Sequence, residues 1–224
     1  MSTEPLAVIF DMDGVLVDSY EAHHESWGMM AREIGRSLTP EQFHATFGRT
    51  SREIIEHHWG QGTLSDEEIL AFDHRKEALY REIVAAAFPV MDGARELISA
   101  LDMAGFRLAV GSSGPPENVE LAIDKLQCER HFHARVTGRD VRRGKPDPEV
   151  FLLAAQRIGV PPSRCAVIED APAGIAAANA AGMLSIGLLS TGHVEADAAF
   201  ANKVIRSLRE LSPEVIAAWI RERS

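Results

Sequence analysis

The feature that most constrains the fold is a short apolar run that ends in acidic residues. Residues 6–9 read Leu-Ala-Val-Ile, and residues 10–19 read Phe-Asp-Met-Asp-Gly-Val-Leu-Val-Asp-Ser. An apolar run without polar alternation is typical of a strand that is buried on both faces of a parallel sheet. In open parallel sheets, ligands bind in the crevice outside the carboxyl ends of the strands. Asp11 is therefore predicted at the edge of a sheet where a ligand would bind.

Asp11 and Asp13 stand only two residues apart. Two such carboxylates repel each other unless a cation lies between them, and Mg²⁺ prefers one or two carboxylates together with a substrate phosphate. Gly14 would let the backbone approach an anion closely. The alternative is that the two aspartates cap the next helix, because Asp after a strand is a common helix start. The pattern favours a magnesium site beside a bound phosphate.

The motif Asp-x-Asp-Gly-Val-Leu-x-Asp-Ser at residues 11–19 resembles the first motif of the haloacid dehalogenase-like (HAD) superfamily. The resemblance implies that Asp11 attacks a phosphoryl group and forms an aspartyl-phosphate. It also implies that Asp13 acts as general acid and base. Relatives that cleave carbon–halogen or carbon–phosphorus bonds lack a carboxylate at this position, so Asp13 makes those reactions unlikely for this chain.

The chain divides into two parts by its hydrophobic patterns. Residues 19–88 carry helical patterns and no strand signal, with capping boxes at Thr39 with Gln42 and at Ser65 with Glu68, and with Ser51 as a further predicted cap. Strands are expected elsewhere at 107–112, 134–137, 165–168 and 184–189, and helices at 93–104, 115–126, 148–158 and 172–181. This alternation predicts a doubly wound parallel α/β sheet with right-handed crossovers. We expect a Rossmann-like core from residues 1–18 and 89–224, and an inserted all-helical cap domain at residues 19–88.

The second predicted core strand is followed by Ser112, Ser113 and Gly114. A hydroxyl at Ser112 can donate to a phosphate oxygen, and Gly114 precedes a helix whose first amides favour anions. Serines in a turn are the alternative interpretation. These residues match the second HAD motif, a Ser or Thr after an apolar strand, and are candidate phosphate-binding residues.

Lys145 lies between Gly144 and Pro146, and the prolines at 146 and 148 restrict the backbone around it. A rigidly held ammonium would offset charge on the nucleophile and on the transferring group. A loop lysine is usually exposed to solvent, which is the alternative. The sequence Lys-Pro-Asp-Pro resembles the third HAD motif, which favours a catalytic role.

Glu169 and Asp170 end another apolar strand, and Gly174 follows. An acidic pair at this point can cap a helix, ligate a metal, or do both. The pattern Glu-Asp-x-x-x-Gly resembles the fourth HAD motif. That resemblance implies that Asp170, with Glu169, completes a Mg²⁺ shell together with Asp11 and the backbone carbonyl of Asp13.

The helical segment carries candidate substrate-binding residues: Arg49, Arg52, Lys76 and His23. Arg49 and Arg52 bracket a helix start where guanidinium groups could hold a phosphate or a sugar hydroxyl. For Arg49, Arg52 and Lys76, the alternative of a solvated surface cation is favoured. His23, Arg52 and Lys76 also match positions of β-phosphoglucomutase-like proteins, a subgroup that the chain resembles over nearly its whole length.

These residues predict a Mg²⁺-dependent phosphatase that acts on a small sugar or polyol phosphate. A β-phosphoglucomutase-type phosphotransferase is the alternative, although mutases typically follow the second-motif Ser with a Lys-Asn-like pair and this chain has Gly114-Pro115-Pro116. A catalytically silent binding protein of the same fold is a third possibility. The complete set of mutually repelling carboxylates argues against it.

Composition limits the partners. A net charge of −10 argues against nucleic acids and anionic membranes as partners, because both require a basic face. The two cysteines lack metal-site spacing, and no apolar run reaches the ~18 residues of a membrane span. We expect a cytoplasmic protein, a monomer or weak dimer, with a small-molecule phosphate ester as its partner.

Overall fold

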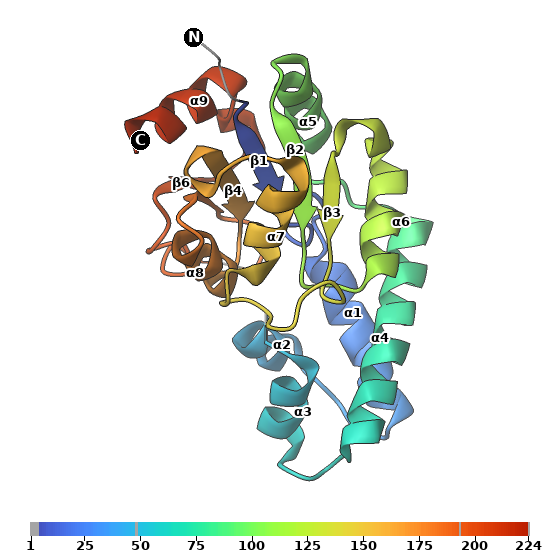
Figure 1. Ribbon diagram of the computed structural model, residues 1–224. Helices are drawn as coiled ribbons and strands as arrows, with labels where there is room; N and C mark the ends of the chain where they lie inside the picture. The colour runs from blue at the N-terminus through green and yellow to red at the C-terminus, as the bar shows by residue number, and fades with distance from the viewer. Residues whose placement is uncertain (1–4, 48, 193, 224) are drawn as a thin grey trace. The chain divides into compact units, whose positions relative to one another are not determined.

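The computed structural model describes residues 5–47, 49–192 and 194–223 (Figure 1). The chain divides into two compact units. One contains the residues up to Asp18 and those from Val90 onward, and the other is Ser19–Pro89. The first unit is the α/β core and the second contains only helices among its described residues.

The core is built on a parallel sheet in which the described residues form six strands. Its spatial order is β3-β2-β1-β4-β5-β6, and every neighbouring pair is parallel. The strands are β1 (Ala7–Phe10), β2 (Arg107–Gly111), β3 (Ala134–Val136), β4 (Cys165–Glu169), β5 (Leu184–Leu188) and β6 (Lys203–Ile205). The central strands β1 and β4 are buried along their whole length, as the flat apolar runs predict. The predicted doubly wound α/β fold is confirmed.

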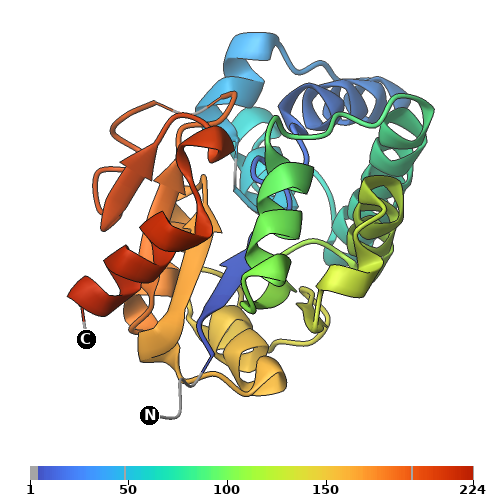
Figure 2. The same cartoon turned by 90° about the horizontal axis from the view of Figure 1, so that it is seen from above.

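Helices cover both faces of the sheet. The core helices are α5 (Ala94–Met103), α6 (Pro116–Leu126), α7 (Glu149–Ile158), α8 (Pro172–Ala180) and α9 (Pro213–Glu222), with single 3₁₀ turns η1 (Glu129–His131), η2 (Pro162–Arg164) and η3 (Leu208–Glu210). Phe151 of α7 and Ala177 of α8 pack with Ile9 and Val167 on one face, and α5 lies on the other (Figure 2). The buried small residues of α8 let it pack closely on the sheet.

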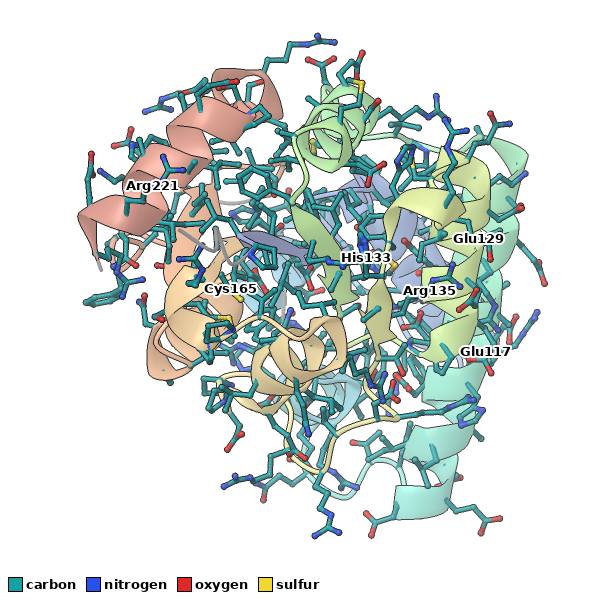
Figure 3. The ribbon with its side chains drawn as sticks, turned by 45° about the horizontal axis from the view of Figure 1, so that its top comes forward. Glu117, Glu129, His133, Arg135, Cys165 and Arg221 are labelled. Atoms are coloured by element: carbon teal, nitrogen blue, oxygen red, sulfur yellow. The ribbon has the colours of Figure 1, made fainter. Side chains whose placement is uncertain are left out.

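The edge strand β3 is fixed by polar side chains. His133, which precedes it, accepts a hydrogen bond from the backbone N–H of Leu108. Arg135 forms ion pairs with Glu120 and Glu129 (Figure 3). His133 thus joins the start of β3 to its neighbour β2, and the ion pairs of Arg135 join β3 to α6 and η1.

The helical unit contains α1 (Tyr20–Glu33), α2 (Pro40–Thr46), α3 (Ser51–Trp59) and α4 (Asp66–Ala86). The capping boxes predicted at Thr39 and Ser65 are both present. The predicted cap of α3 is wrong by one residue, because Thr50 is extended and accepts from Glu53 N–H while Ser51 already belongs to the helix. Aromatic and aliphatic side chains from all four helices form the core of this unit.

After β5, the structure contains two elements that were not predicted, strand β6 and helix α9. Strand β6 has only three residues, too few for a periodic pattern to appear. Helix α9 begins after the N-cap Ser212 and buries Ile216, Ala217 and Ile220. Its start carried a recognisable signal, a capping serine followed by Pro213.

Two further properties concern the cysteines and the length of the helices. Cys128 and Cys165 are free, buried thiols, and burial raises the pKa of both, that of Cys165 to about 12, which disfavours a thiolate at either position. Among the described residues, no helix is long and apolar enough to cross a membrane.

Candidate active site

The carboxyl ends of β1 and β4 bring three acidic side chains together. The backbone N–H of Asp11 donates to the carbonyl of Ile168 at 3.0 Å, so the pairing of the two strands continues to Asp11. This register places Asp11 beside Glu169 and Asp170. Each of the three carboxylates offers an oxygen within 4.8 Å of the others, and all three side chains are buried.

Lys145 joins two of these carboxylates. Its Nζ lies 2.5 Å from Asp11 Oδ1 and 2.7 Å from Glu169 Oε1, with a side chain only 8% exposed. The ammonium also lies 4.9 Å from the centre of the Phe151 ring. The alternative of a solvated loop lysine is therefore wrong. The second oxygen of Glu169 accepts from the N–H of Ala171 at 2.8 Å, so both oxygens of this carboxylate have partners.

The electrostatics of the cluster follow from burial. Burial raises the pKa of Asp11 well above its ordinary value, and the charges of Glu169 and Asp170 raise it further against the opposing effect of Lys145. Burial likewise raises the pKa of Glu169. For Lys145, burial would lower the pKa, but attraction to Asp11 and Glu169 outweighs it and the pKa is raised. The site thus has more negative charge than its ammonium can balance.

This donor set fits a hard divalent cation. Three buried carboxylates face one ammonium, and carboxylate oxygens are the ligands that Mg²⁺ prefers. Gly14 has φ +72°, and a Cβ there would overlap the Asp170 carboxylate. The backbone after Asp13 can approach Asp170 only because this residue is glycine. The anion beside Gly14 is therefore a side chain of the protein itself.

The segment after β2 lies next to the same edge. Ser112 is buried, and its Oγ accepts from the N–H of Gly114 at 3.0 Å. A Cβ built on Gly114 would lie 3.3 Å from Ser112 Oγ and 3.9 Å from Asp13 Oδ2, which places the Asp13 carboxylate near this segment. Ser113 is exposed, and its carbonyl lies against Gly138 so closely that a Cβ there would overlap it.

Comparison with known proteins identifies the family. The family model described as haloacid dehalogenase-like hydrolase matches residues 5–182. This chain belongs to the haloacid dehalogenase-like hydrolases. The predicted family is thereby confirmed.

Three relatives illustrate the similarity. The validoxylamine A 7'-phosphate phosphatase of Streptomyces hygroscopicus subsp. limoneus is 34% identical, over 91% of this chain and 94% of the relative. Hexitol phosphatase A of Escherichia coli (strain K12) is 36% identical over 78% of each chain. The crystal structure of β-phosphoglucomutase from Clostridium difficile superposes with a TM-score of 0.86 and 26% identity, covering 98% of both chains. The family match and the phosphatase relatives confirm the prediction of a phosphoric monoester hydrolase.

Within the helical unit of this HAD hydrolase, two predicted residues meet. Lys76 Nζ lies 2.9 Å from His23 Nδ1 and 2.6 Å from Glu77 Oε1. Lys76 is only 5% exposed, so the expectation that it is a solvated surface cation is wrong. The His23 ring stacks on Tyr80 with a centroid distance of 4.2 Å. Helices α1 and α4 thus enclose a polar cluster of His23, Lys76, Glu77 and Tyr80.

The two arginines of the helical unit differ from Lys76. Arg52 is exposed and forms ion pairs with Asp66 at 2.7 Å and Glu56 at 3.6 Å, as the surface alternative predicted. Arg49 is exposed too. Exposed ion pairs contribute little to stability, so the two pairs of Arg52 leave its side chain free to change partners.

Two contributions to the site of the HAD hydrolase were not predicted. Ser190 follows β5 and donates from its Oγ to Asp170 Oδ2 at 2.8 Å. It is a polar residue just past the carboxyl end of a buried strand, the same signal that identified Asp11 and Ser112. Gly174 lies in α8, and a Cβ there would overlap the Glu169 carboxylate. The sequence contained this glycine in the fourth motif but gave no reason for it.

Proposed function

We propose that this hydrolase is a Mg²⁺-dependent phosphatase that cleaves a small sugar or polyol phosphate through an aspartyl-phosphate intermediate. The observation that carries the proposal is the buried contact of Lys145 with Asp11 and Glu169. An ammonium at this position offsets the negative charge that accumulates when a carboxylate approaches a phosphate.

The proposed reaction has two steps. In the first, an oxygen of Asp11 bonds to phosphorus, the bond from phosphorus to the ester oxygen breaks, and Asp13 gives a proton to the leaving alkoxide. In the second, Asp13 takes a proton from water, the water oxygen bonds to phosphorus, and the bond to Asp11 breaks. Inorganic phosphate leaves and both aspartates return to their starting states. Ser112 and Lys145 donate to the oxygens of the transferring group.

For the cation, we propose the carboxylates of Asp11 and Asp170 and the backbone carbonyl of Asp13 as protein ligands. Bound Mg²⁺ would supply positive charge to the phosphate oxygens. Glu169 was expected among the ligands, but its two oxygens already accept from Lys145 and Ala171. We therefore assign Glu169 to holding Lys145 in place.

The substrate class rests on similarity and on charge. One relative is named for a hexitol and another for validoxylamine A 7'-phosphate. In the helical unit, the ammonium of Lys76 is already paired with Glu77, so the pair can bind hydroxyl groups as donor and acceptor. We propose a polyhydroxylated monophosphate as substrate, a monomer or weak dimer as the active form, and the cytoplasm as its location.

A second candidate function is supported by one similarity. The structure of a β-phosphoglucomutase covers 98% of this chain. His23, Arg52 and Lys76 resemble residues of β-phosphoglucomutase-like proteins, and Lys76 lies in contact with His23. In a mutase, a sugar hydroxyl replaces water in the second step. The Gly114-Pro115-Pro116 segment departs from the mutase pattern, which favours the phosphatase.

A panel of phosphorylated metabolites tests the proposal. With Mg²⁺ present, we expect phosphate release from one or more hexitol or sugar monophosphates. β-Glucose 1-phosphate is expected to give phosphate and glucose or to remain unchanged, with no glucose 6-phosphate by NMR. Efficient isomer formation stimulated by the bisphosphate would favour the mutase. Binding of esters without any turnover would favour a silent binding protein.

A further inference from the structure

Ser190 makes a direct contact with the acidic cluster from a distant part of the sequence. Its Oγ donates to Asp170 Oδ2 at 2.8 Å, across twenty residues of chain. The backbone at Ser190 is held by two hydrogen bonds. The N–H of Leu189 donates to the carbonyl of Ile205 in the neighbouring strand β6, and the N–H of Ser190 donates to the carbonyl of Leu188 in a tight local turn. The hydroxyl is thus held at the end of β5.

Besides its contact with Ser190, Asp170 Oδ2 lies close to the backbone of Gly14. The same oxygen is the atom nearest to the Cβ position of Gly14, where a methyl group would overlap it. Asp170 is 5% exposed and lies within a cluster whose other carboxylates repel it. A buried carboxylate next to two others would rotate away from them unless a donor holds one of its oxygens.

We propose that Ser190 is a positioning residue that orients the Asp170 carboxylate for the divalent cation. The proposal rests on the function proposed above, because it assumes that Asp170 is a metal ligand. By bonding Oδ2, the hydroxyl holds the plane of the carboxylate. Hydrogen bonds that orient metal-binding carboxylates commonly change metal affinity by about 10- to 100-fold when removed.

The competing explanation is that Ser190 is simply a turn residue whose hydroxyl has found an acceptor. The two explanations predict different effects of Ser190 on the affinity for Mg²⁺. A turn residue affects the free energy of unfolding with or without Mg²⁺. A positioning residue changes the affinity for Mg²⁺ even when the protein without metal is equally stable.

The test is direct titration of the full-length, metal-free protein with Mg²⁺ by calorimetry, with Mn²⁺ binding by EPR as a second probe. We expect Ser190→Ala to weaken binding of both cations by about tenfold, and Ser190→Thr, which keeps the hydroxyl, to restore most of the affinity. Ser190→Cys is a second test in case the alanine variant does not fold. It has a side chain of similar volume whose thiol is a poor hydrogen-bond donor, so we expect it to weaken the binding of both cations as well.

Thr191→Ala is the matched control, because this neighbouring residue is exposed in the same loop. We expect it to bind Mg²⁺ with wild-type affinity. The inference is overturned if Ser190→Ala binds both cations as tightly as the wild type, or if Thr191→Ala weakens binding equally. If Ser190→Ala binds the cations with unchanged affinity and still releases phosphate normally, the inference about Ser190 is overturned but the proposed function is not. A wild-type protein that binds neither cation overturns the proposed function with it.

Discussion

At the scale of one residue, the structure explains why the fourth motif, Glu-Asp-x-x-x-Gly, ends in a glycine, which here is Gly174. It lies in the first turn of α8, and the Glu169 carboxylate occupies the space that a Cβ would fill. That carboxylate accepts from Lys145, which in turn contacts Asp11. The absence of one methyl group thus determines where the ammonium beside Asp11, the proposed nucleophile, lies.

Replacing Gly174 with alanine should therefore damage catalysis more than folding. We expect kcat to fall by about 10²-fold, because Glu169 must move and Lys145 loses a partner that holds it against Asp11. Steady-state kinetics on the best substrate would measure this loss. Gly144→Ala is the control, since no atom lies within 4 Å of its Cβ position and it sits next to Lys145. Equal effects of the two substitutions would contradict this account.

Asp11 provides a second prediction at the residue scale. Asp11→Asn should abolish turnover, because an amide cannot attack phosphorus. The variant should be at least as stable as the wild type without Mg²⁺, because burial and the neighbouring carboxylates disfavour the charged form of Asp11. Phosphate release and thermal unfolding in EDTA would check both statements. Substantial phosphatase activity in this variant would exclude Asp11 as the nucleophile.

At the scale of elements, the loop between β3 and α7 carries Lys145 and is held at both ends. Asp140 Oδ2 accepts from the N–H and hydroxyl of Thr137, and Asp140 Oδ1 pairs with Arg157 of α7 at 2.6 Å. Near the other end, Glu149 accepts from the backbone N–H groups of the two arginines at 142 and 143. These contacts explain how an irregular loop can place an ammonium accurately.

The Asp140 contact predicts a pH dependence of stability. The hydrogen bond from Arg157 holds the pKa of Asp140 below its ordinary value. Stability from a lowered carboxyl pKa is complete above the unfolded-state pKa of about 4 and is lost as the pH falls through the folded-state value. Asp140→Asn should therefore lower the free energy of unfolding by about 1 to 2 kcal/mol at pH 7 and by less at pH 3. Urea unfolding at both pH values measures this difference.

Asp124→Asn, on the exposed side of α6, is the control for the pH series and should have no comparable effect. A destabilisation by Asp140→Asn that is the same at pH 3 and pH 7 would contradict the assigned cause.

The elements themselves were largely predictable from the sequence, and the exceptions have physical causes. Apolar runs and proline or glycine boundaries placed the first five strands, β1 to β5, within one or two residues. Adjacent hydroxyl residues, Thr50 and Ser51, both qualify as caps, so only the backbone angles decide between them. The burial of Lys76 could not be predicted, because it depends on the pairing of α1 with α4 that brings His23 to it. Strand β6 depends on its partner β5 rather than on its own three residues.

Contacts between residues of the core site were easier to predict than contacts between residues of the helical unit, and the reason is again structural. Parallel strands align their carboxyl ends, so polar residues that follow several strands must meet at one edge. No such rule connects residues on different helices. Ser190 obeys the rule for strands and could have been found by applying it to β5.

At the scale of the whole molecule, we propose that the helical unit selects the substrate. Lys145 should matter for every substrate, whereas replacing Lys76 or Arg52 with alanine should change the ratio of kcat/KM between substrates by about 1 to 3 kcal/mol. The comparison needs a bulky sugar phosphate and a minimal ester such as p-nitrophenyl phosphate. Arg75→Ala is the control, because Arg75 lies on the same helix as Lys76 and pairs with Glu33. Equal losses on both substrates, or no loss, would make these residues structural or solvated.

The charge distribution leads to the last prediction. The protein carries a net charge of −10 and so repels phosphate esters at long range. Four of the seven residues at 139–145 are cationic, and they lie in the loop between β3 and α7 that carries Lys145. The side chains of Arg142 and Arg143 are exposed. A local cationic segment of this kind can raise the rate at which an anionic substrate reaches the site without taking part in the reaction.

Replacing Arg142 and Arg143 together with alanine should therefore lower kcat/KM by about three- to tenfold at low ionic strength and leave kcat nearly unchanged. The difference from the wild type should shrink in about 0.5 M salt, where the screening length falls to a few ångströms. The matched control replaces Arg221 and Arg223, near the end of α9, which contacts β4 and the turn η2 just before the amino-terminal end of β4. Kinetics over a range of salt concentrations would measure both double variants. A loss in kcat, a loss that does not depend on salt, or an equal loss in the control would show that this loop does not attract the substrate through its charge.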